Sequence, residues 1–224
     1  MNKSPRHWDQ LLQSAKRPLL AATLGVTLLS SLSGCAVLFV GSAVGGAMSA
    51  SDRRTFGAQT EDTSIEFKGG SRISTVFGDA VHVNVNSYNR KVLLTGEVKD
   101  EATKAKVGAE IAALENVSSV VNEIQVSMFL SSFGSRSSDT LLASKVRAKL
   151  VGTKDIYSSS FKIVTEAGVV YLMGRVSVRE GDTAAASIQE VSGVQKIVKV
   201  YEYIDEAEVK KFTAKPAEAP PPAN

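Results

Sequence analysis

Side chains that commonly serve in catalysis and metal binding are scarce in this chain of 224 residues. It has one cysteine, Cys35, and two histidines, His7 and His82. A single thiol cannot form an internal disulfide, and a lone imidazole after Cys35 argues against a zinc site, a Cys/His pair or a Ser/His/Asp triad there. His82 alternates with Val81 and Val83, so we expect it to face away from the core, in solvent or at an interdomain contact. We expect no enzyme activity, no metal and no cofactor.

Two pairs of acidic residues are the other candidates for proton transfer. Asp100 and Glu101 follow one predicted β-hairpin, and Glu180 and Asp182 follow a second. Each pair also stands in the first turn of a predicted helix, where a carboxylate stabilises the positive end of the helix dipole. We therefore interpret both pairs as helix-terminal charges and not as catalytic acids.

Cys35 follows a segment with the features of a secretory signal. The first 17 residues are polar with four basic side chains, and an apolar run occupies residues 18–32. Residues 32–35 (LSGC) resemble a bacterial lipobox, in which a signal peptidase cuts after Gly34 and the sulfur receives a diacylglyceride. We predict a lipoprotein signal peptide over residues 1–34 and an acylated Cys35. The alternative is an uncleaved transmembrane helix, because apolar residues continue beyond the cysteine.

The residue after the cysteine bears on the destination of the protein. By resemblance to Gram-negative lipoproteins, Ala36 implies sorting to the outer membrane, with the mature protein lipid-anchored and facing the periplasm. Each buried CH₂ of an acyl chain contributes about 0.8 kcal/mol, so several chains form a stable anchor where one does not.

The net charge of +3 comes entirely from the predicted signal. The first 35 residues hold four of the 26 basic and one of the 23 acidic side chains, so the remainder has 22 of each. A balanced chain has no global field that attracts nucleic acid, and any attraction to an anion must come from a local patch. We expect no nucleic-acid partner.

The rest of the chain contains an internal repeat. Residues 92–98 (VLLTGEV) match residues 170–176 (VYLMGRV) at an offset of 78, and residues 116–121 match residues 193–198 at an offset of 77. This repeat indicates two related domains of about 65 residues each. The expected parts are the lipidated cysteine with a flexible stem (35–60), a first domain (61–128), a linker (129–138), a second domain (139–206) and a disordered, proline-rich tail (207–224).

Each copy has the same predicted order of elements. In the second copy the pattern predicts a helix over 139–151 with Asp139 at its amino end, strands over 161–165 and 169–176, a helix over 179–191 and a strand over 194–204. This order predicts an α+β sandwich, a three-stranded sheet with helices on one face. In the first copy we expect Gly69 and Gly70 to interrupt the first helix. Arg53 and Arg54 are interpreted as charged stem residues or contacts to lipid headgroups.

Two such units behind a lipobox resemble the BON domain lipoproteins. The likeness lies in the two hydrophobic-Gly-Val strands that end at Val98 and Val176, and in residues 139–147, 172–174 and 191–194. The resemblance implies an αββαβ fold in each unit, no catalysis, recognition of an anionic phospholipid such as phosphatidylglycerol or cardiolipin by the second unit, and a role in envelope integrity. It also implies a tryptophan at the position that Leu141 occupies here.

A helical wheel of residues 141–151 separates a buried stripe from an exposed tip. Leu142, Ala143, Val146 and Leu150 share one stripe, and Leu141 falls nearly opposite. An apolar tip among cations is typical of a helix that lies on an anionic membrane. The predicted lipid-binding residues are Leu141, Lys145, Arg147, Ala148 and Lys149.

Two other interpretations remain open for this part of the chain. A helix with three basic residues is most often a solvated face, and single exposed leucines are common. The protein could also be an interaction module that recruits an envelope protein through exposed sheet edges or through the strand containing Tyr201, Glu202 and Tyr203.

Overall fold

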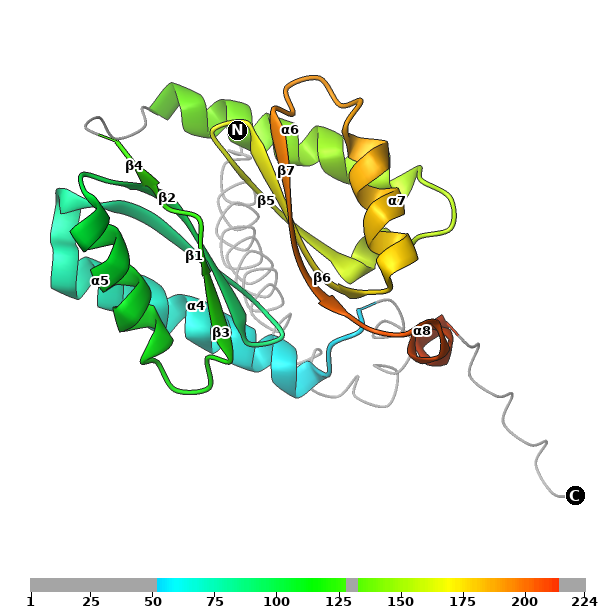
Figure 1. Ribbon diagram of the computed structural model, residues 1–224, viewed down its shortest axis with the longest axis horizontal. Helices are drawn as coiled ribbons and strands as arrows, with labels where there is room; N and C mark the ends of the chain where they lie inside the picture. The colour runs from blue at the N-terminus through cyan, green and yellow to red at the C-terminus, as the bar shows by residue number, and fades with distance from the viewer. Residues whose placement is uncertain (1–51, 128–132, 214–224) are drawn as a thin grey trace, which may run out of the picture. The chain divides into compact units, whose positions relative to one another are not determined.

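The structure is a computed structural model that describes residues 52–127 and 133–213, apart from the side chains of residues 133–137 and 213. Residues 49–224 form one compact unit, and its described part contains two α+β domains in succession (Figure 1). The predicted signal peptide, Cys35 and the stem up to residue 51 lie outside the described residues. Within the described ranges, no helix has the length and apolar character that crossing a bilayer requires.

The first domain is built around a β-hairpin. Strands β1 and β2 pair antiparallel, and β3 and the short β4 both pair parallel to β2. The helices pack on one face of this sheet through a core that includes Ile65, Val92, Val107 and Ile111. The elements are α4 (Phe56–Phe77), a 3-10 turn (Gly78–Ala80), β1 (His82–Tyr88), β2 (Lys91–Val98), α5 (Glu101–Ala112), β3 (Ser119–Asn122) and β4 (Gln125–Val126).

The second domain repeats the same order and adds a helix. Its sheet has the order β5-β6-β7, with β5 and β6 antiparallel and β6 and β7 parallel. The elements are α6 (Phe133–Val151), a 3-10 turn (Ser158–Ser160), β5 (Phe161–Glu166), β6 (Val169–Val176), α7 (Val178–Ile188), β7 (Lys196–Tyr203) and α8 (Glu206–Thr213). The predicted α+β fold, with helix, strand, strand, helix and strand in each copy, is confirmed, although the short β4 gives the first sheet a fourth strand.

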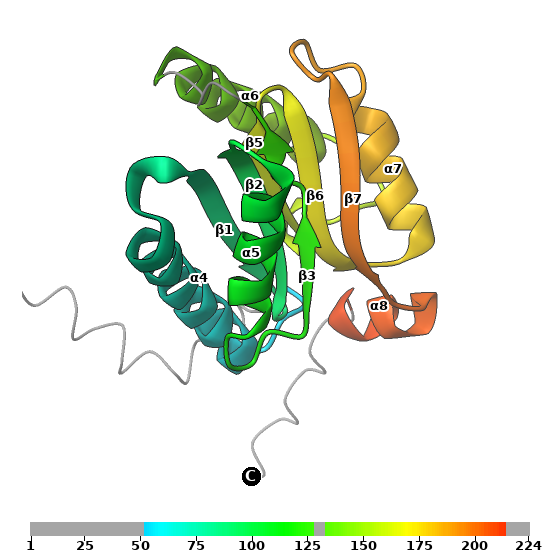
Figure 2. The same cartoon turned by 60° about the vertical axis from the view of Figure 1, so that its left-hand side comes forward.

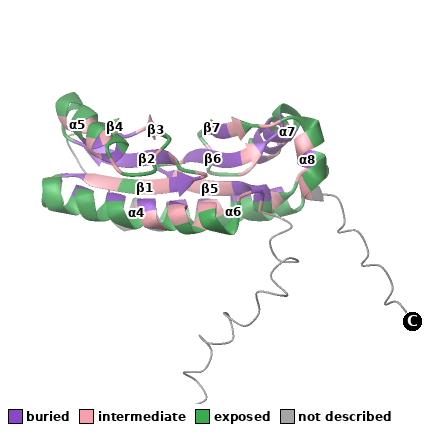
Figure 3. Ribbon diagram, turned by 90° about the horizontal axis from the view of Figure 1, so that it is seen from below, coloured by how far each residue is buried: buried purple, intermediate pink, exposed green. Residues whose placement is uncertain are grey.

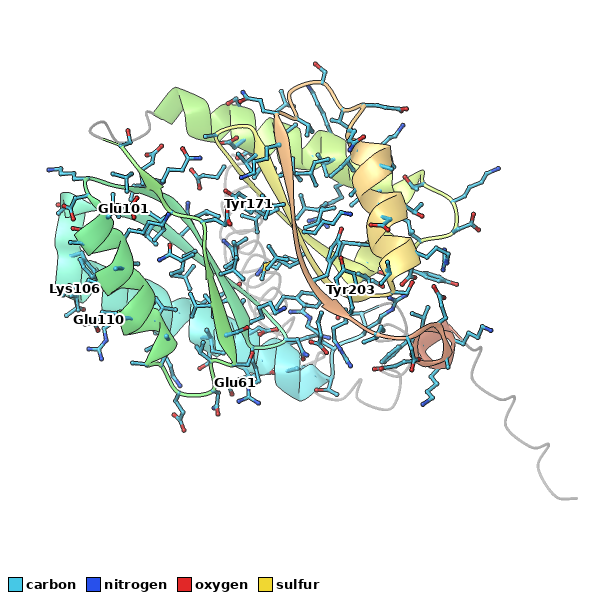
Figure 4. The ribbon with its side chains drawn as sticks, viewed as in Figure 1. Glu61, Glu101, Lys106, Glu110, Tyr171 and Tyr203 are labelled. Carbon is cyan, nitrogen blue, oxygen red and sulfur yellow. The ribbon has the colours of Figure 1, made fainter. Side chains whose placement is uncertain are left out.

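The two sheets pack against each other by the faces that the helices leave free. Side chains alternate along β2, so Leu93 lies on the opposite face from Val92 and joins a separate cluster with Tyr171, Met173 and Val200 of the second domain. Figure 2 shows the sheets between the helices of the two domains, and in Figure 4 Tyr171 lies between the sheets. The domains are therefore docked.

Helix α4 differs from the expectation at both its start and its middle. It begins at Phe56, inside the segment expected to be stem, because the Thr55 hydroxyl accepts a hydrogen bond from the Ala58 amide and caps it. It also continues through Gly69 and Gly70, so the predicted interruption is wrong. A Cβ on Gly69 would lie 2.8 Å from Val85 Cγ1. The glycine lets the helix lie close to the sheet, and that packing outweighs its low helix propensity.

Two further boundaries differ from the expectation. Helix α6 begins at Phe133, within the expected linker, so Asp139 lies inside the helix and not at its amino end. Residues expected to begin a disordered tail form α8, in which Val209 is buried and Glu208 pairs with Arg175 at 2.8 Å. These tertiary contacts hold a short helix that its sequence alone would not stabilise.

Candidate functional site

Helix α6 packs on the second sheet by the face that the wheel predicts. Leu142, Val146 and Leu150 are buried in the core of the second domain, and Ala143 is half-buried. Leu141 points the other way and is 58% exposed. The helix therefore presents a large aliphatic side chain to its surroundings.

The basic residues predicted to surround Leu141 are all exposed, and so is Ala148. Lys149 Nζ lies 2.9 Å from Glu190 Oε2, and this hydrogen bond lowers the pKa of Glu190. Lys145 and Arg147 have no ion-pair partner among the described residues. Within that part of the chain, the outward face of α6 thus has two cations without an ion-pair partner and a third, Lys149, that is paired with Glu190.

A groove lies beside Leu141. It has a volume of about 520 Å³, and Leu141 and Lys145 of α6 form one side of it. Gly168 in the β5–β6 turn, and Gly193 and Gln195 before β7, lie on its other side. An apolar side chain, an ammonium group and a groove of mixed polarity therefore meet at the amino-terminal half of α6.

Asp139 holds α6 against the hairpin of the second domain. Its carboxylate oxygens accept hydrogen bonds from the amides of Ala167 at 2.9 Å and Gly168 at 3.1 Å, and its carbonyl accepts from the Thr165 hydroxyl at 2.8 Å. Both turn residues have positive φ, 48° and 76°. Asp139 thus joins α6 to the β5–β6 turn through hydrogen bonds across the domain.

The first domain has an aspartate with the same kind of hydrogen bonds at the equivalent position. The Asp62 carboxylate accepts from the amides of Asn89 and Arg90, each at 2.7 Å, and from the Ser87 hydroxyl at 2.6 Å. Asp62 and Asp139 are separated by the offset of 77 that the repeat shows elsewhere. Sequence reasoning missed Asp62 and placed Asp139 only at the amino end of a helix, although the repeated aspartate at that offset was the signal.

The stem arginines are part of the fold, which corrects their interpretation as spacer or headgroup contacts. Arg53 is 2% exposed and donates two hydrogen bonds to the Glu180 carboxylate, at 2.6 and 2.7 Å. Arg54 pairs with Asp62 at 2.8 Å and lies over the Tyr88 ring, 4.1 Å from its centroid. One arginine is thus fixed in each domain.

The other candidate chemical groups have structural partners. Asp100 caps α5 by accepting from the Thr103 amide at 2.7 Å, which lowers its pKa. Glu180 forms a capping box with Ser177 at the start of α7. Asp182 pairs with Lys199 at 2.6 Å. Asp100, Glu101 and Glu180 are helix-terminal charges as interpreted, but Asp182 lies beyond the first turn of α7, so that interpretation is wrong for it.

His82 lies where the two domains meet. It is half-buried, and its Nε2 atom has no hydrogen-bond partner among the described residues. With Asn84, it lines a cavity of about 400 Å³ together with Asp139 and Glu166 of the second domain. Of the two expected surroundings, solvent or an interdomain contact, the structure favours the second.

Comparison with known proteins finds one family match in each of the two repeated domains. The BON domain model matches residues 62–128 and 138–204, one match in each domain. The chain therefore belongs to the BON domain family. It is 34% identical over 191 residues to the outer membrane lipoprotein DolP of Haemophilus influenzae, in a match that covers 83% of this chain and 96% of that protein. The expected resemblance to the dual BON domain lipoproteins is confirmed.

Two other likenesses are weaker. The chain is 29% identical over 155 residues to the 21 kDa hemolysin of Actinobacillus pleuropneumoniae, covering 68% of this chain and 79% of that protein. The C-terminal domain of CdsD, a structural protein of the type III secretion system of Chlamydia trachomatis, is 12% identical with a TM-score of 0.27, and the match covers 60% of this chain and 96% of that one. So low a score carries no argument.

Proposed function

We propose that this protein is held on the periplasmic side of the outer membrane by acyl chains on Cys35 and binds anionic phospholipid through α6, in support of envelope integrity. The observation that carries the proposal is the exposed Leu141 on the same helix as the exposed Lys145 and Arg147. The likeness to an outer membrane lipoprotein supports the location.

The chemistry of the proposed contact follows from these side chains. Leu141 enters the boundary between headgroups and acyl chains, while the cations meet lipid phosphates. Each cation near an anionic surface contributes about 1 kcal/mol, and Lys149 contributes less because Glu190 competes for it. This attraction is weak alone, but an anchor at Cys35 raises the effective concentration of the helix at the membrane.

The test measures binding of the full mature chain to vesicles without its acyl anchor. In a Cys35→Ser background, we expect binding to phosphatidylglycerol vesicles that weakens as salt is added and is weaker on phosphatidylcholine. Leu141→Glu should weaken it further, and Val178→Glu, at an exposed site on α7, should not. If the Leu141→Glu variant bound as tightly as its Cys35→Ser parent, with an unchanged circular dichroism spectrum, α6 would not be the lipid-binding site.

The second candidate function is recruitment of an envelope protein. It is favoured by the position of β7 at the edge of its sheet, where Tyr203 is 53% exposed. Tyr201 contributes little to that surface, since it is buried in the domain core. Binding of one protein partner in the absence of lipid, lost in Tyr203→Ser and retained in Leu141→Glu, would favour this function over the first.

A further inference from the structure

Helix α4 exposes two phenylalanines on its outward face. Phe56 is 82% exposed and Phe67 is 77% exposed, more than any other large hydrophobic side chain in the described part of the chain. They are eleven residues apart, which is close to three helical turns, so they lie on one side of the helix about 16 Å apart along its axis. Contact of two aromatic rings with water is unfavourable, and apolar patches of this kind commonly mark interaction surfaces.

The rest of this face lies wholly within the described residues and carries no charge. Between and beyond the phenylalanines it consists of Thr60, Thr63, Ser71 and Ser74, all exposed. The hydroxyls of Thr60 and Thr63 donate to carbonyls of their own helix, those of Phe56 and Gln59, each at 3.0 Å. These two hydroxyl groups therefore need no hydrogen-bond acceptor from outside the helix. A solvent-facing helix surface is normally rich in charged residues, so this one is suited to the boundary of a bilayer.

The position of the face in the chain puts it near the proposed anchor. Sixteen residues separate Cys35 from Asp52, and an extended chain spans at most about 3.6 Å per residue, so the start of the fold lies within roughly 60 Å of the acylated sulfur. Arg53 and Arg54 fix the end of this segment directly before α4. The segment is thus short enough for Phe56 to contact the membrane in which Cys35 is anchored.

Helices α4 and α6 share one side of the structure. In Figure 3 they lie along the bottom of the view, beside the edge strands β1 and β5, with α5 and α7 higher in the view, and exposed residues of both helices face away from the strands. A membrane that meets Leu141 on α6 is therefore on the side to which α4 belongs.

We propose that the outward face of α4 is a second membrane-contact surface, which inserts Phe56 and Phe67 at the bilayer boundary without a requirement for anionic lipid. This inference rests on the anchoring at Cys35 proposed above. It differs from the α6 contact in its chemistry: the described α4 face has no cations, so salt and headgroup charge do not govern it. The first domain then contributes apolar contact and the second contributes charge.

Fluorescence tests this directly, because the chain has one tryptophan, Trp8, within the predicted signal peptide. After mass spectrometry establishes that the leader is absent, Phe67→Trp and Phe56→Trp each give a single-tryptophan lipoprotein. In phosphatidylcholine vesicles containing acyl-chain nitroxide lipids, we expect a blue shift and quenching at both positions that high salt does not reverse. The control Val178→Trp, at an exposed site of α7, should be neither shifted nor quenched.

A second measurement separates this surface from α6. In the Cys35→Ser chain, Phe56→Ser with Phe67→Ser should reduce partitioning into phosphatidylcholine vesicles by about tenfold or more, since two aromatic side chains are lost from the boundary. Quenching at 56 and 67 that persists in a Leu141→Glu background supports the proposal. Quenching of Leu141→Trp without quenching at 56 and 67 would overturn it and leave the α6 site standing. A blue shift that depends on protein concentration, without lipid quenching, would assign the face to a second copy and overturn it too.

Discussion

Arg53 and Glu180 form a bidentate ion pair across 127 residues of sequence, with both side chains 2% exposed. The same arginine donates to the Arg175 carbonyl at 2.8 Å, and the same glutamate accepts from the Ser177 amide at 3.0 Å. Arg53, within the expected stem, is thus fixed at the start of α7. Any pull on the stem acts on the second domain as well as on α4.

Removal of one partner of this pair should destabilise the protein strongly. Arg53→Ala leaves the Glu180 carboxylate buried without its cation, and such changes cost about 3–5 kcal/mol. Urea unfolding of the full chain measures the loss. Arg72→Ala is the matched control, because Arg72 is half-exposed and pairs with Glu110 at the surface, where the cost is about 0–1 kcal/mol. Equal effects of the two changes would show that the buried pair contributes no more than a surface one.

The same pair predicts a dependence of stability on pH. Burial alone would raise the pKa of Glu180, but the hydrogen bonds from Arg53 and the Ser177 amide outweigh it and lower the pKa below its ordinary value of 4.5. A lowered carboxylate pKa stabilises the folded state above the unfolded pKa and loses that stabilisation as pH falls through the folded value. We expect the free energy of unfolding to fall below about pH 4.5. In Glu180→Gln the fall should be smaller, and an identical pH profile would contradict this assignment.

The two adjacent glycines of α4 should respond in opposite directions to alanine. Nothing lies within 4 Å of a Cβ on Gly70, so Gly70→Ala should stabilise by about 0.5–1 kcal/mol through helix propensity. A Cβ on Gly69 meets Val85 Cγ1 at 2.8 Å and Ile111 Cδ1 at 3.4 Å, so Gly69→Ala should destabilise by about 1–3 kcal/mol. Thermal unfolding compares them. Stabilisation by both would mean that the helix does not lie as close to β1 as the structure places it.

The carboxylate of Asp139 should control the protection of the β5–β6 turn. In Asp139→Ala the amides of Ala167 and Gly168 lose their acceptor, and we expect a loss of about 1–3 kcal/mol together with faster hydrogen exchange at both amides. Asp62→Ala should have the corresponding effect at Asn89 and Arg90 of the first domain. Exchange rates unchanged at residues 167 and 168 in the first variant would show that the turn holds without the aspartate.

The sequence by itself determined the repeated order of elements and the orientation of α6. Strand periodicity and the matched segments around Val98 and Val176 predicted both hairpins, because side chains alternate along a strand whatever it packs against. Helical periodicity likewise placed Leu141 and Leu142 on different faces of α6. Both rules are local, since they depend on residues a few positions apart.

Only the tertiary structure decided where the helices begin and what their polar residues hold. The pairing of Arg53 with Glu180, and the clamp of Asp139 on Ala167 and Gly168, join positions far apart in sequence, and no local spacing marks them. Helix α4 passes through Gly69 because its contact with Val85 outweighs the cost of glycine in a helix. Burial and long-range hydrogen bonds depend on which elements the folded chain brings together, so they override propensity at these positions.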